Sequence, residues 1–185
     1  MINPLRLAQI AEASVTTERA TGCPAELLVA QCGLESSWLA DAPEYNCFGI
    51  KAYGGCYCKQ LLRTKEWFSD KDRSVFLNGD ESRTADLVMP VQQDKVGRKL
   101  YAVRDWFAGF QSLSDCFSIR ARMFSAGRYA PASVQYAKDR DLAKYIRTIG
   151  PIYASAPSYA ATVLSIINQA DVKQAISTAR AELKS

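Results

Sequence analysis

Apolar residues near the beginning of the chain recur at the spacing of one helix face: Leu7, Ile10, Ala11 and Val15. Asn3 and Pro4 before this stripe suit the start of a helix, and Gly22 after it suits the end. A second predicted helix begins at Pro24 and ends at about Trp38, and it is apolar nearly all round. Such a helix is typical of a buried position at the centre of a domain.

The helical period is lost between about residues 41 and 110. Five glycines interrupt this stretch: Gly49, Gly54, Gly55, Gly79 and Gly97. Two short β-prone runs, 64–68 and 100–103, predict a small hairpin or a three-stranded sheet. The polar segment 69–99 between them predicts a long loop or a loop insertion, and long loops in compact domains are often lids or binding loops.

Helices are predicted again in the last part of the chain. Ser112 and Asp115 form a pattern like a capping box, and an inward stripe follows it up to Gly127: Leu113, Phe117, Arg120, Ala121 and Phe124. A further helix is expected over about residues 132–149, stopped by the Gly-Pro pair that follows. The final helix is expected to begin near Pro157.

These elements together predict a mainly helical α+β fold, in which helices surround a small β-hairpin lobe. With 185 residues, 48% of them apolar, the chain fits a single domain over residues 1–185, with a loop insertion at 69–99. No stretch is apolar for long enough to predict a membrane span. The net charge of +4 comes without a long basic run, so nucleic acid is not an expected partner.

The chain contains no histidine. Its absence excludes Ser-His-Asp and Cys-His catalytic pairs, removes the commonest zinc ligand and disfavours a peptidase or amidase. Cys47, Cys56 and Cys58 do not restore a metal site, because their spacing is unlike that of a zinc knuckle. We therefore expect no metal and no cofactor, and we expect carboxylates to carry protons in any reaction the chain catalyses.

Glu35 ends an apolar run and is followed closely by Trp38. A carboxyl group packed against Leu and Trp side chains is partly desolvated, which disfavours its charged form and suits it to donate a proton. Glycoside cleavage is the reaction class that needs such an acid. The alternative is an ordinary solvated glutamate on a helix surface.

The cysteines and the amino terminus favour different compartments. Six cysteines suit disulfides in an oxidising compartment. At least one pair is expected to form there among Cys23, Cys47, Cys56, Cys58 and Cys116, whereas Cys32, inside an apolar helix, is interpreted as a buried small hydrophobic residue. The first twenty residues lack the uninterrupted apolar core of a secretory signal peptide. Either a leader has been removed, or the protein leaves the cell by another route, such as host lysis or a contractile injection machine.

Four ordered segments carry a further signal: residues 30–38 (AQCGLESSW), 46–51 (NCFGIK), 64–66 (TKE) and 153–159 (YASAPSY). They resemble the motifs of the glucosaminidase domains of glycoside hydrolase family 73, which include the cell-wall hydrolase domains of flagellar rod assembly proteins and bacterial autolysins. The resemblance implies a lysozyme-like fold and cleavage of peptidoglycan glycan strands next to N-acetylglucosamine. The chain departs from the family in its cysteines and in the long segment 69–99.

By this resemblance, Glu35 is the catalytic acid and Glu66 is a second glutamate carried on the β-hairpin. Tyr153 matches an aromatic residue beside the reacting sugar. Two routes remain open after the proton is given up. Either Glu66 activates a water molecule, or the 2-acetamido group of the substrate attacks the anomeric carbon while Tyr153 holds that intermediate.

Four further residues are candidates for substrate binding. Asn46 and Phe48 match a loop that lines the family's groove, and Trp38 and Tyr159 are aromatic residues that could contact sugars. Each has an alternative interpretation, because aromatic rings at helix ends often pack in a core and an asparagine often forms a turn.

The sequence therefore predicts an endo-β-N-acetylglucosaminidase that degrades cell walls in the periplasm or outside the cell. A muramidase or lytic transglycosylase is the alternative among enzymes, and a non-catalytic wall-binding module is the alternative of another class. Peptidoglycan glycan strands are the expected partner. A secreted antibacterial effector with a secretion machine and an immunity protein, a phage lysin and an autolysin are the biological roles that fit.

Overall fold

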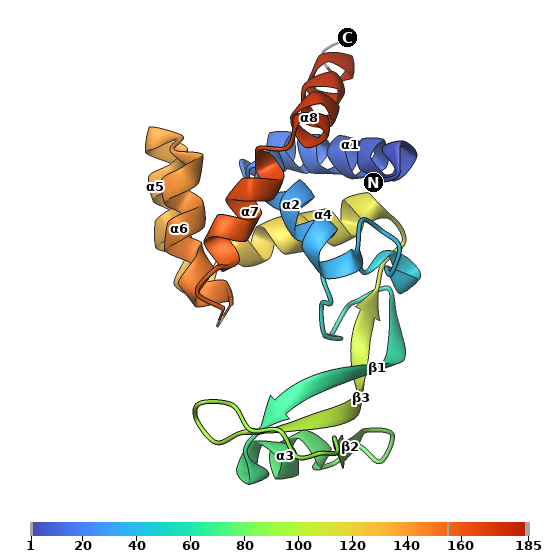
Figure 1. Ribbon diagram of the computed structural model, residues 1–185. Coiled ribbons are helices and arrows are strands. Elements are labelled where there is room, and N and C mark those ends of the chain that lie inside the picture. Colours follow the sequence, from blue (N-terminus) through green and yellow to red (C-terminus); the bar gives the residue numbers. More distant parts are fainter. Residues whose placement is uncertain (1, 155, 184–185) are drawn as a thin grey trace. The chain divides into compact units, whose positions relative to one another are not determined.

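The computed structural model describes residues 2–154 and 156–183 (Figure 1). Packing divides the chain into two compact units. The helical unit consists of the residues up to Gly49 and those from Phe110 onward, and the β unit consists of Ile50–Gly109. That both belong to one domain over residues 1–185 stays a prediction.

The helical unit contains most of the helices of the chain. They are α1 (Pro4–Thr21), α2 (Ala25–Ser36), α4 (Leu113–Phe124), α5 (Ala130–Asp139), α6 (Leu142–Tyr153), α7 (Tyr159–Ile167) and α8 (Ala170–Glu182), with short 3₁₀ segments at Pro43–Tyr45 and Gly127–Tyr129. Helix α1 packs against α2, α4 and α8, and α2 also packs against α7.

The two predicted amino-terminal helices are confirmed. The Asn3 side chain caps α1 by accepting hydrogen bonds from two backbone amides of the first turn, and Gly22 ends the helix at a φ of 77°. In α2, four consecutive side chains are fully buried: Leu27, Leu28, Val29 and Ala30. The apolar composition all round the helix is thus explained by its position in the core.

The helices after residue 130 differ from the prediction. The helix expected over 132–149 is two helices, because Arg140 adopts a left-handed φ of 55° and ends α5. Pro151 does not stop α6, which continues to Tyr153. The φ of proline is compatible with a helix, and so near the helix end a proline removes only one backbone hydrogen bond. The last turn of α6 therefore still forms. This extra turn carries Tyr153.

The β unit contains the predicted three-stranded sheet. Its strands are β1 (Cys58–Phe68), β2 (Thr84–Leu87) and β3 (Lys99–Gly109), antiparallel in the order β1-β3-β2. In this register Glu66 lies opposite Tyr101. The β-hairpin lobe of the predicted mainly helical α+β fold is therefore confirmed.

The segment 69–99 is not a loop throughout, as its polarity had suggested. It contains β2 and the helix α3 (Asp70–Leu77), which the Ser69 side chain caps. Phe76 and Leu77 of α3 pack with Phe68 against a small core of Ala85, Tyr101 and Val103. Elements of eight and four residues are too short to give a clear periodic pattern in the sequence. Whether the segment is an insertion stays untested.

Within the described residues, none of the helices is both long enough and apolar enough to cross a membrane.

Candidate functional site

Glu35 lies in the last turn of α2, and its side chain is exposed. The expectation that Leu and Trp side chains would bury it is wrong, because the apolar faces of α2 point into the core and this position points away. Directly after the helix, Ser37, Trp38 and Leu39 all have positive φ, between 49° and 64°. Such a run of left-handed non-glycine residues is costly, and strained backbone of this kind clusters at functional sites.

Tyr153 is brought to Glu35 by the end of α6. Its hydroxyl donates a hydrogen bond of 2.7 Å to Oε1 of Glu35. Burial raises the pKa of Tyr153 above its ordinary value of 10.0; the Glu35 carboxylate adds to this rise, whereas Arg120 opposes it. The hydroxyl therefore keeps its proton at neutral pH and can donate to Glu35 there.

A second tyrosine extends the aromatic surface beside Tyr153. The ring of Tyr159 lies 5.0 Å from that of Tyr153, at an interplanar angle of 37°. The Gln31 side-chain amide donates to the Tyr159 hydroxyl at 2.5 Å. Burial raises the pKa of Tyr159 to about 12, so this hydroxyl also stays neutral. The structure thus brings Glu35, Tyr153 and Tyr159 together from three helices.

Arg120 is the residue of this region that sequence reasoning did not assign to the site. It lies on α4, is 4% exposed, and donates from Nε to Oε1 of Gln31 at 3.0 Å. Its guanidinium carbon lies 4.5 Å from the centroid of the Tyr153 ring. A signal was present, because an arginine stood within an otherwise apolar stripe, which is unusual unless the charge has partners.

Trp38 has a half-buried side chain that packs on the end of α2. A Cβ atom built on Gly33 would lie 2.7 Å from the Trp38 ring, so only glycine leaves room for the indole at this place. The face of the ring that does not meet Gly33 remains a candidate for sugar contact, as the sequence suggested. That role stays a prediction.

The two residues predicted to line the groove are buried. Phe48 is 4% exposed, and its ring lies 4.8 Å from that of Phe117. Asn46 is 5% exposed. Both therefore pack inside the helical unit, and their predicted contact with substrate stays untested.

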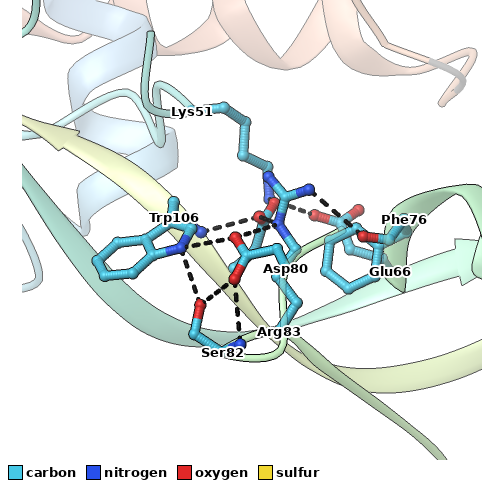
Figure 2. A network of polar contacts seen from close by, with 8 residues as sticks. Lys51, Glu66, Phe76, Asp80, Ser82, Arg83 and Trp106 are labelled. Atoms are coloured by element: carbon cyan, nitrogen blue, oxygen red, sulfur yellow. Dashed lines mark hydrogen bonds and ion pairs between the residues drawn. The ribbon is translucent and has the colours of Figure 1, made fainter. Parts of the chain in front are cut away.

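Glu66 belongs to β1 of the β unit, where it forms part of a polar network (Figure 2). Lys51 lies 3.0 Å from Oε1 of Glu66 and 2.8 Å from Oδ2 of Asp105. The Glu66 side chain is 37% exposed, whereas that of Asp105 is only 9% exposed. Lys51 thus connects a partly accessible glutamate to a buried aspartate.

The far side of this network is anchored by Arg83 and Trp106. Nε of Arg83 lies 3.0 Å from Oδ1 of Asp105, which is an ion-pair contact without good hydrogen-bond geometry. The Trp106 indole donates to Asp80 at 2.9 Å and to Ser82 at 3.0 Å, as Figure 2 shows. These contacts attach the turn before β2 to the sheet, so Asp105 and Lys51 have fixed surroundings.

The six cysteines, all within the described part of the chain, are free thiols in the structure. The Sγ atoms of Cys47 and Cys116 lie 3.7 Å apart in the core of the helical unit. Burial raises the pKa of Cys47 far above its ordinary value, and contacts with Cys116 and Cys32 add to this. These buried thiols are therefore packing residues here, and a disulfide in an oxidising compartment stays a prediction.

Comparisons with known proteins agree with the fold and the motifs. Solved structures with a similar fold include a peptidoglycan hydrolase mutant from Sphingomonas sp. A1 (TM-score 0.62, 21% identity, covering 95% of this chain and 99% of that one). They also include the catalytic domain of the autolysin Auto from Listeria monocytogenes (TM-score 0.64, 18% identity, covering 92% of this chain and 85% of that one). A third is the glycoside hydrolase domain of FlgJ from Salmonella typhimurium (TM-score 0.59, 20% identity, covering 99% of this chain and 99% of that one). No curated protein matches the chain.

Residues 11–172 match the glucosaminidase family, described as mannosyl-glycoprotein endo-beta-N-acetylglucosaminidase. The match includes the whole β unit, most of the helical unit and all seven predicted site residues. The chain therefore belongs to the glucosaminidase family of glycoside hydrolases.

Proposed function

We propose that this protein hydrolyses the glycan strands of peptidoglycan as an endo-β-N-acetylglucosaminidase. The family supplies the reaction class. The substrate is supported by the solved structures of similar fold, several of which are named as peptidoglycan hydrolases or autolysins. The observation that carries the proposal is the exposed Glu35 carboxyl at the end of α2, held by the Tyr153 hydroxyl.

Glu35 is the proton donor in this proposal. Cleavage of a glycosidic bond needs protonation of the leaving oxygen while positive charge develops at the anomeric carbon. An exposed carboxyl on the last turn of a rigid, buried helix can reach a substrate oxygen and keep its position. The Tyr153 hydrogen bond occupies Oε1, so Oε2 is the oxygen left to face the substrate.

Tyr153 has a second role, which depends on the route taken after protonation. If the substrate acetamido group attacks the anomeric carbon, the N–H of that group becomes a stronger donor as positive charge develops, and the oxygen of the Tyr153 hydroxyl, whose proton points to Glu35, can accept a hydrogen bond from it. If water attacks instead, a base is needed, and Glu66 is the candidate. Its salt bridge to Lys51 keeps the Glu66 carboxylate in a defined place within the β unit.

The proposed site of action is the cell wall, in the periplasm or outside the cell. Peptidoglycan is therefore the proposed partner, and no metal or cofactor takes part in the proposed steps. Autolysin, phage lysin and secreted antibacterial effector all remain consistent with this chemistry.

Product analysis tests the proposed bond. Purified peptidoglycan is digested with the protein, and the soluble fragments are reduced and analysed by mass spectrometry, with Glu35→Gln as the blank. We expect new reducing ends on N-acetylglucosamine. Reducing ends on N-acetylmuramic acid would identify a muramidase, and anhydro ends would identify a lytic transglycosylase. Binding to the wall without any released fragment would identify a binding module.

A further inference from the structure

A buried arginine, Arg120, packs on the ring of Tyr153, the tyrosine that donates a hydrogen bond to Glu35. Arg120 is 4% exposed, and no ion pair to it is found within the described part of the chain. Its Nη2 is buried without a hydrogen-bond partner among the described residues. Burying a guanidinium that is neither ion-paired nor fully hydrogen-bonded is unfavourable, so stability alone does not explain an arginine at this position.

The partners of Arg120 are aromatic rings and one amide. The guanidinium carbon lies 4.5 Å from the ring centroid of Tyr153, 5.0 Å from that of Phe124 and 5.2 Å from that of Phe48. Cation–π attraction of this kind strengthens when the cation is shielded from water. Nε donates to Gln31 at 3.0 Å, which fixes the direction in which the planar group points.

Two chains of contacts lead from Arg120 to the candidate site. In the first, the guanidinium holds the Tyr153 ring, and the Tyr153 hydroxyl donates to Glu35. In the second, Arg120 orients the Gln31 side chain by binding its oxygen, which leaves the amide nitrogen to donate to the Tyr159 hydroxyl. The two chains meet again where the rings of Tyr153 and Tyr159 lie 5.0 Å apart.

We propose that Arg120 is a positioning residue for the glycosidase reaction. Its buried guanidinium sets the Tyr153 ring so that the hydroxyl meets Glu35, and through Gln31 it sets Tyr159 beside that ring. The inference rests on the proposed function, in which Glu35 is the acid. Arg120 does not touch the substrate. It acts through Tyr153, because it holds the ring in the position from which the hydroxyl donates to Glu35.

A double-mutant cycle tests this role. The variants are Arg120→Met, Tyr153→Phe and both together, assayed on soluble peptidoglycan glycan fragments. Arg120→Met should lower kcat by about tenfold or more and change KM by less than about threefold, because placement rather than binding is lost. In the Tyr153→Phe background, which has no hydroxyl to place, the same change should lower kcat by less than about twofold.

The matched control is Arg122→Met, which removes an exposed arginine from the same helix and should leave kcat unchanged. Equal effects of Arg120→Met in both Tyr153 backgrounds would overturn the proposal. An Arg120→Met variant that keeps the wild-type kcat would also overturn the proposal.

Arg120→Lys keeps the proposal testable if Arg120→Met does not fold. Lysine keeps the charge but cannot bind Gln31 and cover the Tyr153 ring at once. The NMR resonances of the Tyr153 ring, assigned with Tyr153→Phe, should shift in Arg120→Lys and stay in place in Arg122→Met. Unshifted resonances would overturn the proposal. This readout does not depend on activity, so it is separate from the Glu35→Gln assay, in which retained activity would instead disprove the proposed function.

Discussion

At the scale of single residues, the main chemical feature is the pairing of an exposed glutamate with the hydroxyl of a half-buried tyrosine. Glu35 itself makes few contacts, so Tyr153 determines which of its oxygens is free. The raised pKa of Tyr153, caused mainly by burial, keeps that hydroxyl protonated. A hydroxyl that stays protonated at neutral pH remains available there as a donor to Glu35.

Tyr153→Phe should lower kcat by about 10- to 100-fold while the fold is kept. The ring would still pack against Phe124 and Tyr159, and only the hydrogen bond to Glu35 would be lost. Release of soluble fragments from purified peptidoglycan measures the rate, and circular dichroism checks the fold. Tyr136→Phe, on α5, is the control for loss of a tyrosine hydroxyl. Equal rates for the two variants would show that the hydroxyl of Tyr153 has no catalytic part.

Gly33→Ala tests the packing of Trp38. In a helix interior this change normally stabilises by about 1 kcal/mol. Here the new Cβ would lie 2.7 Å from the indole ring, well inside van der Waals contact, so the ring must move. We expect no gain in the free energy of unfolding, measured with urea, together with a changed tryptophan fluorescence. In a Trp38→Ala background the usual gain should return. The same gain in both backgrounds would contradict the packing.

The sequence proposes Glu35 as a candidate acid, whereas for Arg120 it shows only an unusual arginine in an apolar stripe and indicates no role, for a physical reason. A catalytic glutamate belongs to a local motif, which neighbouring residues identify. The role of Arg120 depends on Gln31 and Tyr153, which are far away in the sequence and come together only through folding. The burial expected for Glu35 was wrong for a related reason, since periodicity gives the face of a helix but not what covers its last turn.

At the scale of elements, the hairpin of α5 and α6 shows how a few polar contacts decide where a helix ends. The two helices lie side by side (Figure 1). Asp139 accepts hydrogen bonds from the Gln135 side chain, the Asp141 amide and Lys144, and Arg140 between them takes a left-handed conformation. The sequence shows neither glycine nor proline at this break, so the periodic pattern runs through it without a stop signal.

Asp139→Asn should destabilise the protein in a pH-dependent way. Hydrogen bonds from Gln135, from the Asp141 amide and from Lys144 lower the pKa of Asp139 from 3.8 to about 2. A lowered pKa in the folded state gives stability that is complete above about pH 4 and is lost as the pH falls toward 2. The difference in unfolding free energy between wild type and variant, from urea titrations, should therefore shrink over this window.

Asp41→Asn, at an exposed aspartate elsewhere, is the control for the replacement of a surface aspartate and is measured in the same titrations. A difference for Asp139→Asn that is constant from pH 6 to below pH 3 would contradict the role given to these contacts.

The β unit contains two long strands that the sequence pattern indicates and two short elements that it does not. The β-prone runs 64–68 and 100–103 predicted parts of the long strands β1 and β3, which pair antiparallel. Helix α3 and strand β2 were missed because each is short and mostly exposed, and their stability comes from contacts with Phe68 and Tyr101 rather than from local propensity. The network around Asp105 needs the turn before β2, so it could not be predicted without that strand.

At the scale of the whole molecule, each unit supplies one of the two candidate carboxyl groups. Glu35 belongs to the helical unit and Glu66 to the β unit. The matched residues 11–172 include the whole β unit and most of the helical unit. The two routes proposed for the second chemical step differ in whether the β unit must provide a base.

Glu66→Gln decides between these routes. If the substrate acetamido group is the nucleophile, this variant should lose clearly less activity than Glu35→Gln, because no base on the protein is needed. If Glu66 activates water, the two losses should be similar, about 100-fold or more. Lys51→Met, which removes the salt bridge but leaves the carboxylate, should have a smaller effect than Glu66→Gln under the second route. An inactive Glu66→Gln with a native fold would rule out the first route.

The most direct test of the central claim is the rate at which Glu35→Gln releases soluble fragments from purified peptidoglycan. The amide keeps the shape of the side chain and can still accept the Tyr153 hydrogen bond, but it has no acidic proton. We expect a rate below about one hundredth of the wild-type rate, with an unchanged circular dichroism spectrum. A variant that retains more than about a tenth of the wild-type rate, a deficit under about 1.4 kcal/mol, would show that Glu35 is not the acid.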